Sequence, residues 1–119
     1  MCYHFNMRIL KPIKKSDHAL FSLIEERIIQ GQYVFLQHSS QRLNERNVSE
    51  LDVIYILSGK KGYGRKRNKK KDSYEPFSLT ELAEDWKYCI EGHDIDGNNL
   101  RVIVTFSEDL MPIITVIRI

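Results

Sequence analysis

The strongest constraint on the fold is a change in hydrophobic period at Trp86. Over residues 86–91 and again over 100–106, larger apolar side chains alternate with mostly polar ones, which is typical of β-strands with one buried face. Asp96-Gly97 supplies the chemistry of a tight turn between these two segments. Pro112–Ile119 is apolar on both faces, which indicates an interior strand. Three consecutive strands in an antiparallel meander are the simplest arrangement of this C-terminal third.

Two segments before residue 60 carry helical periodicity instead. In the first, Ser16 is placed to cap a helix whose apolar residues recur every three or four positions until Gly31. In the second, Ser49 precedes two acidic residues and a broad apolar face that ends at Ser58-Gly59. Tyr33–Gln37, between them, is short and β-prone. Helices followed by strands predict an α+β fold, with two main helices packed on one face of a C-terminal antiparallel sheet.

Length and composition favour a single domain over residues 1–119. Apolar residues at 42% and charged residues at 29% are ordinary for a globular protein, and no apolar run is long enough to suggest a membrane span. The first residues lack the order of a secretory signal, so we expect a cytoplasmic protein. Cys2 and Cys89 give neither a disulfide framework nor zinc-site spacing, and no cofactor motif is matched. The sequence therefore predicts no metal, no cofactor and no membrane partner.

Charge is concentrated in residues 60–71, which hold eight cations and no acid. The remainder of the chain holds more acids than cations, although the whole has a formal net charge of +2. No apolar period runs through this stretch, so we predict a basic loop or the tip of a hairpin. A cationic projection on an acidic body favours a polyanionic partner bound at a defined place, and for a cytoplasmic protein a nucleic acid is the natural candidate, although a solvated loop is the default interpretation.

A second charged pattern places His38, Arg42 and Arg46 four residues apart. On a helix this spacing keeps the three side chains on one slowly drifting stripe. His38 directly follows the β-prone segment and precedes two serines that could cap a helix, and helix N-termini favour anions. A titratable imidazole beside fixed guanidiniums suits proton transfer at a bound phosphate. Surface helices also carry arginines at this spacing simply as solvated or paired charges, which is the competing interpretation.

The run from His38 to Ser49 resembles a small bacterial family of unknown function with the pattern HxxxRxxxRx[IV]S. That family is similar to the RelE-like toxins, and the order of elements is also similar to that of the MqsR-like messenger-RNA interferases. The resemblance implies a metal-independent endoribonuclease of a type II toxin–antitoxin pair, on a compact RelE- or barnase-like fold and with a cognate antitoxin as partner. The lysine and tyrosine positions of the MqsR-like enzymes have no clear match, which leaves the catalytic acid open.

If the chain is such a ribonuclease, its reaction needs a proton acceptor, a proton donor and cations for the charge on the phosphate. We assign His38 as base or acid, Arg42 and Arg46 as phosphate-binding residues, and Arg118 as a stabiliser of developing charge. Candidates for the second proton function are Tyr63 and Lys87. The residues expected to bind RNA are Arg65, Lys66, Arg67, Lys87 and Arg101.

Two other functions remain open from the sequence. One is a non-catalytic RNA- or ribosome-binding module in which the basic stretch provides all the affinity. The other is a protein-interaction domain whose basic stretch docks onto an acidic partner. On the sheet, Lys87, Arg101 and Arg118 are spread over three predicted strands, and their convergence on one face would favour a ligand site there.

Overall fold

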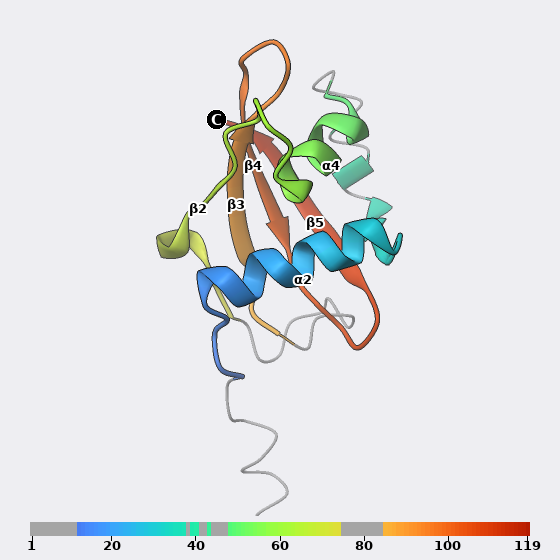
Figure 1. Cartoon of the computed structure of the whole chain (residues 1–119), viewed down its shortest axis with the longest axis vertical. Coiled ribbons are helices and arrows are strands. Elements are labelled where there is room, and N and C mark those ends of the chain that lie inside the picture. The colour runs from blue at the N-terminus through green and yellow to red at the C-terminus, as the bar shows by residue number, and fades with distance from the viewer. Residues whose placement is uncertain (1–11, 38, 41–42, 44–47, 75–84) are drawn as a thin grey trace, which may run out of the picture.

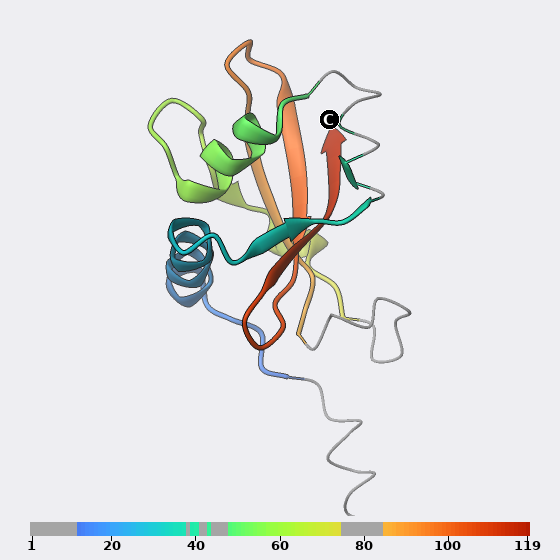
Figure 2. The ribbon, with the colours of Figure 1, turned by 90° about the vertical axis from the view of Figure 1, so that its right-hand side faces the viewer.

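The computed structural model describes residues 12–37, 39–40, 43, 48–74 and 85–119. They form an α+β structure with two helices and a mixed five-stranded sheet (Figure 1). Seen from the side, both helices lie on the same face of the sheet (Figure 2). The predicted α+β class and the packing of two helices on one face are confirmed.

Helix α2 (Asp17–Ile29) forms because its ends are capped and its apolar residues share one face. The Ser16 side chain accepts a hydrogen bond from the Ala19 amide at 3.2 Å, as the sequence predicts. Leu20 and Ile24, four residues apart, are fully buried beneath the helix. Burial of each such side chain is worth about 2 kcal/mol relative to leaving it in water.

Helix α4 (Glu50–Ser58) is capped in the predicted way at both ends. The Ser49 side chain accepts a hydrogen bond from the Leu51 amide at 3.1 Å. Gly59 ends the helix in the left-handed conformation, with φ of 74°. Ile56 and Leu57 on the inner face are fully buried against the strands.

Three strands form the predicted meander: β3 (Tyr88–His93), β4 (Asn99–Val104) and β5 (Met111–Arg118). Two short strands widen it into a sheet of order β1-β5-β4-β3-β2, so β5 is an interior strand, as expected. β1 (Tyr33–Phe35) runs parallel to β5, and β2 (Lys66–Arg67) runs antiparallel to β3. The expectation of a purely antiparallel sheet is therefore wrong, because strands of three and two residues are too short to show their pairing through a period of two.

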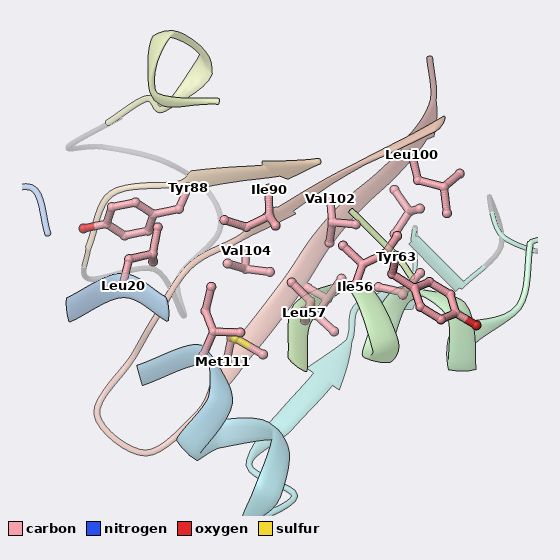
Figure 3. Close-up of a cluster of buried hydrophobic side chains, with 14 of the residues drawn as sticks. Leu20, Ile56, Leu57, Tyr63, Tyr88, Ile90, Leu100, Val102, Val104 and Met111 are labelled. Carbon is pink, nitrogen blue, oxygen red and sulfur yellow. The ribbon is translucent and has the colours of Figure 1, made fainter. Parts of the chain in front are cut away.

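The core lies between the two helices and the inner face of the sheet (Figure 3). Fully buried side chains from both helices and from all three meander strands meet there: Leu20, Ile24, Ile56, Leu57, Tyr88, Ile90, Leu100, Val102, Val104, Met111 and Ile113. Within the described ranges, no helix has the length and apolar character needed to cross a membrane.

Candidate functional site

The predicted catalytic stripe cannot be located in this structure. His38, Arg42 and Arg46 lie outside the described residues, so their assigned roles stay predictions. The other predicted site residues lie in the basic stretch and on or beside the sheet.

The basic stretch is folded onto the edge of the sheet. A loop from Lys60 leads into β2, whose Lys66 lies opposite Glu91 and whose Arg67 lies opposite Ile90 in β3. The chain then forms a short 3₁₀ turn, η1 (Lys69–Lys71), which projects beyond β2 (Figure 1). The predicted loop or hairpin tip thus contains an edge strand and a helical turn. Its six lysines are all exposed: Lys60, Lys61, Lys66, Lys69, Lys70 and Lys71.

Arg65 joins the basic stretch to both helices. Its guanidinium pairs with the Glu25 carboxylate at 3.1 Å and donates to the Leu57 carbonyl at 2.9 Å. It also lies over the Phe21 ring, 4.2 Å from the centroid. These contacts fix the loop that carries Lys60 and Lys61 against the body of the protein.

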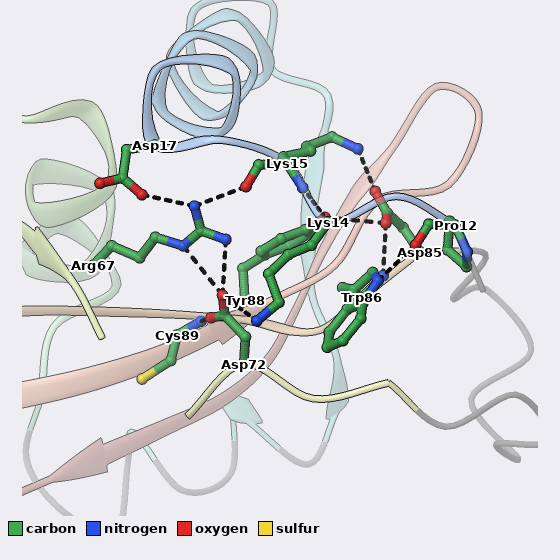
Figure 4. A network of polar contacts seen from close by, with 10 residues as sticks. All are labelled: Pro12, Lys14, Lys15, Asp17, Arg67, Asp72, Asp85, Trp86, Tyr88 and Cys89. Atoms are coloured by element: carbon green, nitrogen blue, oxygen red, sulfur yellow. Dashed lines mark hydrogen bonds and ion pairs between the residues drawn. The ribbon is translucent and has the colours of Figure 1, made fainter. Parts of the chain in front are cut away.

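Arg67 is almost completely buried, with a side chain only 2% exposed. Its guanidinium donates to the carboxylates of Asp17 and Asp72, each at 2.8 Å, and to the Lys15 carbonyl at 2.8 Å (Figure 4). The Asp72 carboxylate is fully buried and also accepts a hydrogen bond from the Cys89 amide at 2.9 Å. The fold therefore uses the charge of Arg67 to hold the start of α2, the end of η1 and β3 together.

A second group of contacts continues this network (Figure 4). The Lys15 ammonium pairs with the Asp85 carboxylate, which also accepts a hydrogen bond from the Tyr88 hydroxyl at 3.1 Å. Burial raises the pKa of Tyr88 above its ordinary value, so the hydroxyl stays a hydrogen-bond donor. The Trp86 indole donates to the Pro12 carbonyl at 2.8 Å. The segment before α2 is thereby fastened to the entrance of β3.

The register of the sheet separates Lys87, Arg101 and Arg118, whose convergence would favour a ligand site. Arg101 lies opposite Glu91 on the face away from the helices, and its Nε donates to the Glu91 carboxylate at 2.9 Å. Arg118 lies opposite the buried Leu100, which is on the helix-covered face. Lys87 shares a face with Arg101 but is bridged to Ser73, several residues away along the sheet. The strands do not bring these three side chains to one place.

Sequence analysis missed His93, the last residue of β3. Its ring lies between two hollows of about 280 and 500 Å³. The smaller is also lined by Lys66, Glu91 and Asn99, and the larger by Tyr63 among others. The available signal was a histidine directly after Gly92 at a strand end, a place where side chains commonly face a loop. Among the described residues, no group of three His, Cys, Asp or Glu side chains could hold a metal ion.

Comparison with curated proteins and with solved structures found no match. A family model described as a domain of unknown function, DUF4258, matches residues 35–118. This match begins at the last residue of β1 and covers α4, the basic stretch and the whole meander, together with the predicted stripe. The chain therefore belongs to the DUF4258 family.

Proposed function

We propose that this protein is an RNA-binding domain that acts as a metal-independent endoribonuclease, the toxin of a type II toxin–antitoxin pair. The observation that carries the proposal is the row of exposed lysines on the edge segment formed by β2 and η1. Its position is held by the buried Arg67 and the half-buried Arg65. A cationic surface of fixed shape binds a phosphate backbone with less ordering cost than a free loop.

The catalytic part of the proposal rests on the sequence pattern. A 2′-hydroxyl of RNA can attack the adjacent phosphate when a base removes its proton and cations hold the phosphate oxygens. His38 is proposed as that base or as the acid for the leaving oxygen, with Arg42 and Arg46 on the phosphate. A RelE- or barnase-like arrangement, a cytoplasmic location and a cognate antitoxin belong to the same proposal.

The test is cleavage of a mixed RNA pool by the wild type and by His38→Ala, both in the presence of a chelator, with binding measured in parallel. Cleavage by the wild type only, at similar RNA affinity, supports a metal-independent ribonuclease centred on His38. Binding without cleavage by either protein contradicts a free enzyme. Adding ribosomes then asks whether cleavage requires them.

A non-catalytic RNA- or ribosome-binding module is the second candidate. It is favoured by the way in which Arg65 and Arg67 hold the lysines in place, since such anchoring is sufficient for binding alone. It predicts that Lys70→Ala/Lys71→Ala weakens RNA binding, whereas His38→Ala changes neither binding nor the integrity of the RNA.

A further inference from the structure

The two hollows beside His93 are built from the loop that precedes β2 and from the ends of β3 and β4. The His93 ring is stacked on the Tyr63 ring, with centroids 6.5 Å apart and planes 12° apart. Tyr63 in turn meets Tyr55 edge to face at 5.3 Å. Because Tyr63 is only 8% exposed, it forms a firm support for the imidazole.

The loop approaches His93 so closely that only glycine fits at one position. A Cβ atom on Gly64 would lie 2.9 Å from His93 Cδ2 and 3.0 Å from Nε2. His93 Nδ1 lies 3.2 Å from the Asp94 carbonyl oxygen. The contacts of the His93 ring are thus the Asp94 carbonyl and the stacked Tyr63 ring, and both hollows lie beside it.

The charges around the smaller hollow favour an anion. In the smaller hollow, hydrogen bonds from Asn68 and Arg101, each at 2.9 Å, engage the Glu91 carboxylate and hold its pKa below the ordinary value. Lys66 is exposed in the same hollow and Asn99 adds an amide group. The smaller hollow thus offers a lysine, an imidazole and an amide beside an acid that is already paired.

The larger hollow combines aromatic rings with two lysines. Tyr55, Tyr63 and His93 line it together with Lys60 and Lys61, and the Lys60 ammonium lies 3.9 Å from the Tyr55 ring centroid. Its acid, Asp94, accepts hydrogen bonds from the Asn98 amide and side chain at 2.8 and 3.0 Å. Burial alone would raise the pKa of Asp94, but these hydrogen bonds outweigh it and lower the pKa.

We propose that the paired hollows bind one nucleotide of single-stranded RNA, with its phosphate beside Lys66 and Asn99 and its base against His93 and Tyr63. Aromatic rings beside a cationic groove are the usual platform for single-stranded nucleic acid, because every base has a face that can stack. The site deepens the proposed function, on whose RNA-binding part it rests. The site includes Tyr63, a candidate for the second proton function, but neither His38 nor the phosphate-binding Arg42 and Arg46. The tests vary His93, Lys66 and Gly64 and measure binding alone, so the site can fail while cleavage is retained.

The test measures binding of a fluorescent single-stranded RNA of about five nucleotides, near the lower end of known site sizes. We expect His93→Ala to weaken binding about tenfold, as for loss of one stacked base, and Lys66→Ala to weaken it by a similar factor. His18→Ala is the matched control, because His18 is exposed on α2, away from the hollows.

A second pair of variants tests the geometry without removing a polar group. Gly64→Ala pushes a methyl group into the His93 ring, whereas Gly62→Ala meets nothing within 4 Å, although its φ of 98° is more strained for alanine than the 56° of Gly64. We expect Gly64→Ala to weaken binding several-fold more than Gly62→Ala. The unfolding midpoint of each variant is measured first. The RNA affinities of the two variants are then compared at a temperature where both are folded.

Three outcomes separate the hypotheses. The nucleotide site is overturned if the NMR signals of the His93 side chain do not shift when RNA is added and His93→Ala binds RNA as tightly as the wild type. If that result accompanies weakened binding in Lys70→Ala/Lys71→Ala, RNA binding itself is retained and only the subsite fails. Full competition by inorganic phosphate or by duplex RNA at equal concentration also overturns the proposed single-strand site.

Discussion

At the scale of single residues, the clearest prediction concerns the buried charge of Arg67. Arg67→Met leaves the fully buried Asp72 carboxylate without its closest cation, and Lys14 remains only at 3.9 Å. Because an uncompensated buried charge is costly, we expect the free energy of unfolding to fall by about 3 kcal/mol. Urea denaturation measures the change.

The control for this prediction removes the charge from the partner as well. In Arg67→Met/Asp72→Asn, the asparagine oxygen can still accept the Cys89 hydrogen bond while no carboxylate is buried. The double variant should therefore be more stable than Arg67→Met alone. Equal or lower stability would show that Arg67 acts through packing and not through its charge.

The ionisation of Glu91 predicts how the stability of the fold changes with pH. Its pKa is lowered in the folded state, chiefly by the hydrogen bond from Asn68 and further by Arg101. A lowered pKa means that the ionised group stabilises the fold above its ordinary value of 4.5, and that this contribution is lost as the pH falls through the folded-state pKa. Glu91→Gln should thus be less stable than wild type at about pH 7, with the difference disappearing in acid.

The measurement is the urea midpoint as a function of pH for wild type, Glu91→Gln and the exposed control Glu108→Gln. The control should follow the wild-type curve. A constant difference between Glu91→Gln and wild type across the whole acid range would contradict a role for the ionised carboxylate.

At the scale of elements, the residue that ends α4, Gly59, needs both a positive φ and the absence of a side chain. Gly31 and Gly59 each have a positive φ, 69° and 74°, which is strained for alanine by about 1 kcal/mol. A Cβ on Gly31 meets nothing, whereas one on Gly59 would lie 2.7 Å from Cζ of Arg65. Since Arg65 is held by Glu25 and Leu57, Gly59→Ala should cost roughly 2 kcal/mol or more and Gly31→Ala only about half of that.

Comparison of the two unfolding midpoints tests this prediction directly. Equal losses would mean that the Arg65 side chain moves aside freely. In that case Arg65 would not be the fixed anchor of the basic loop that its contacts indicate.

The sequence predicted elements well where several local signals agreed. Both helices have a serine cap, an apolar face and a terminal glycine, and their observed ends match. The meander followed from a period of two around Asp96-Gly97. The pairing of β1 and β2 could not be predicted, because two or three residues carry no readable period and their partners lie far away in the chain.

At the scale of the whole molecule, charge could be counted from the sequence but not located. All eight cations of residues 60–71 looked equivalent in the sequence, yet Arg67 is buried among acids brought from α2 and η1. Likewise, nothing local shows that His93 meets Gly64 and Tyr63, since that contact depends on β2 docking beside β3. Long-range pairing decides which charges are structural and which remain available to a partner.

The distinction between the buried Arg67 and the exposed lysines of the basic stretch predicts the salt dependence of RNA binding. Each phosphate contact to single-stranded RNA contributes about 0.7 to the slope of log affinity against log salt. If Lys70 and Lys71 each contact a phosphate, Lys70→Ala/Lys71→Ala should reduce the magnitude of that slope by about 1.4. Ser22→Glu/Gln30→Glu changes the net charge equally but at two exposed positions, one on α2 and one at its C-cap, and it should leave the slope nearly unchanged. Equal slopes for all three proteins would mean that overall charge, and not the β2–η1 edge, attracts RNA.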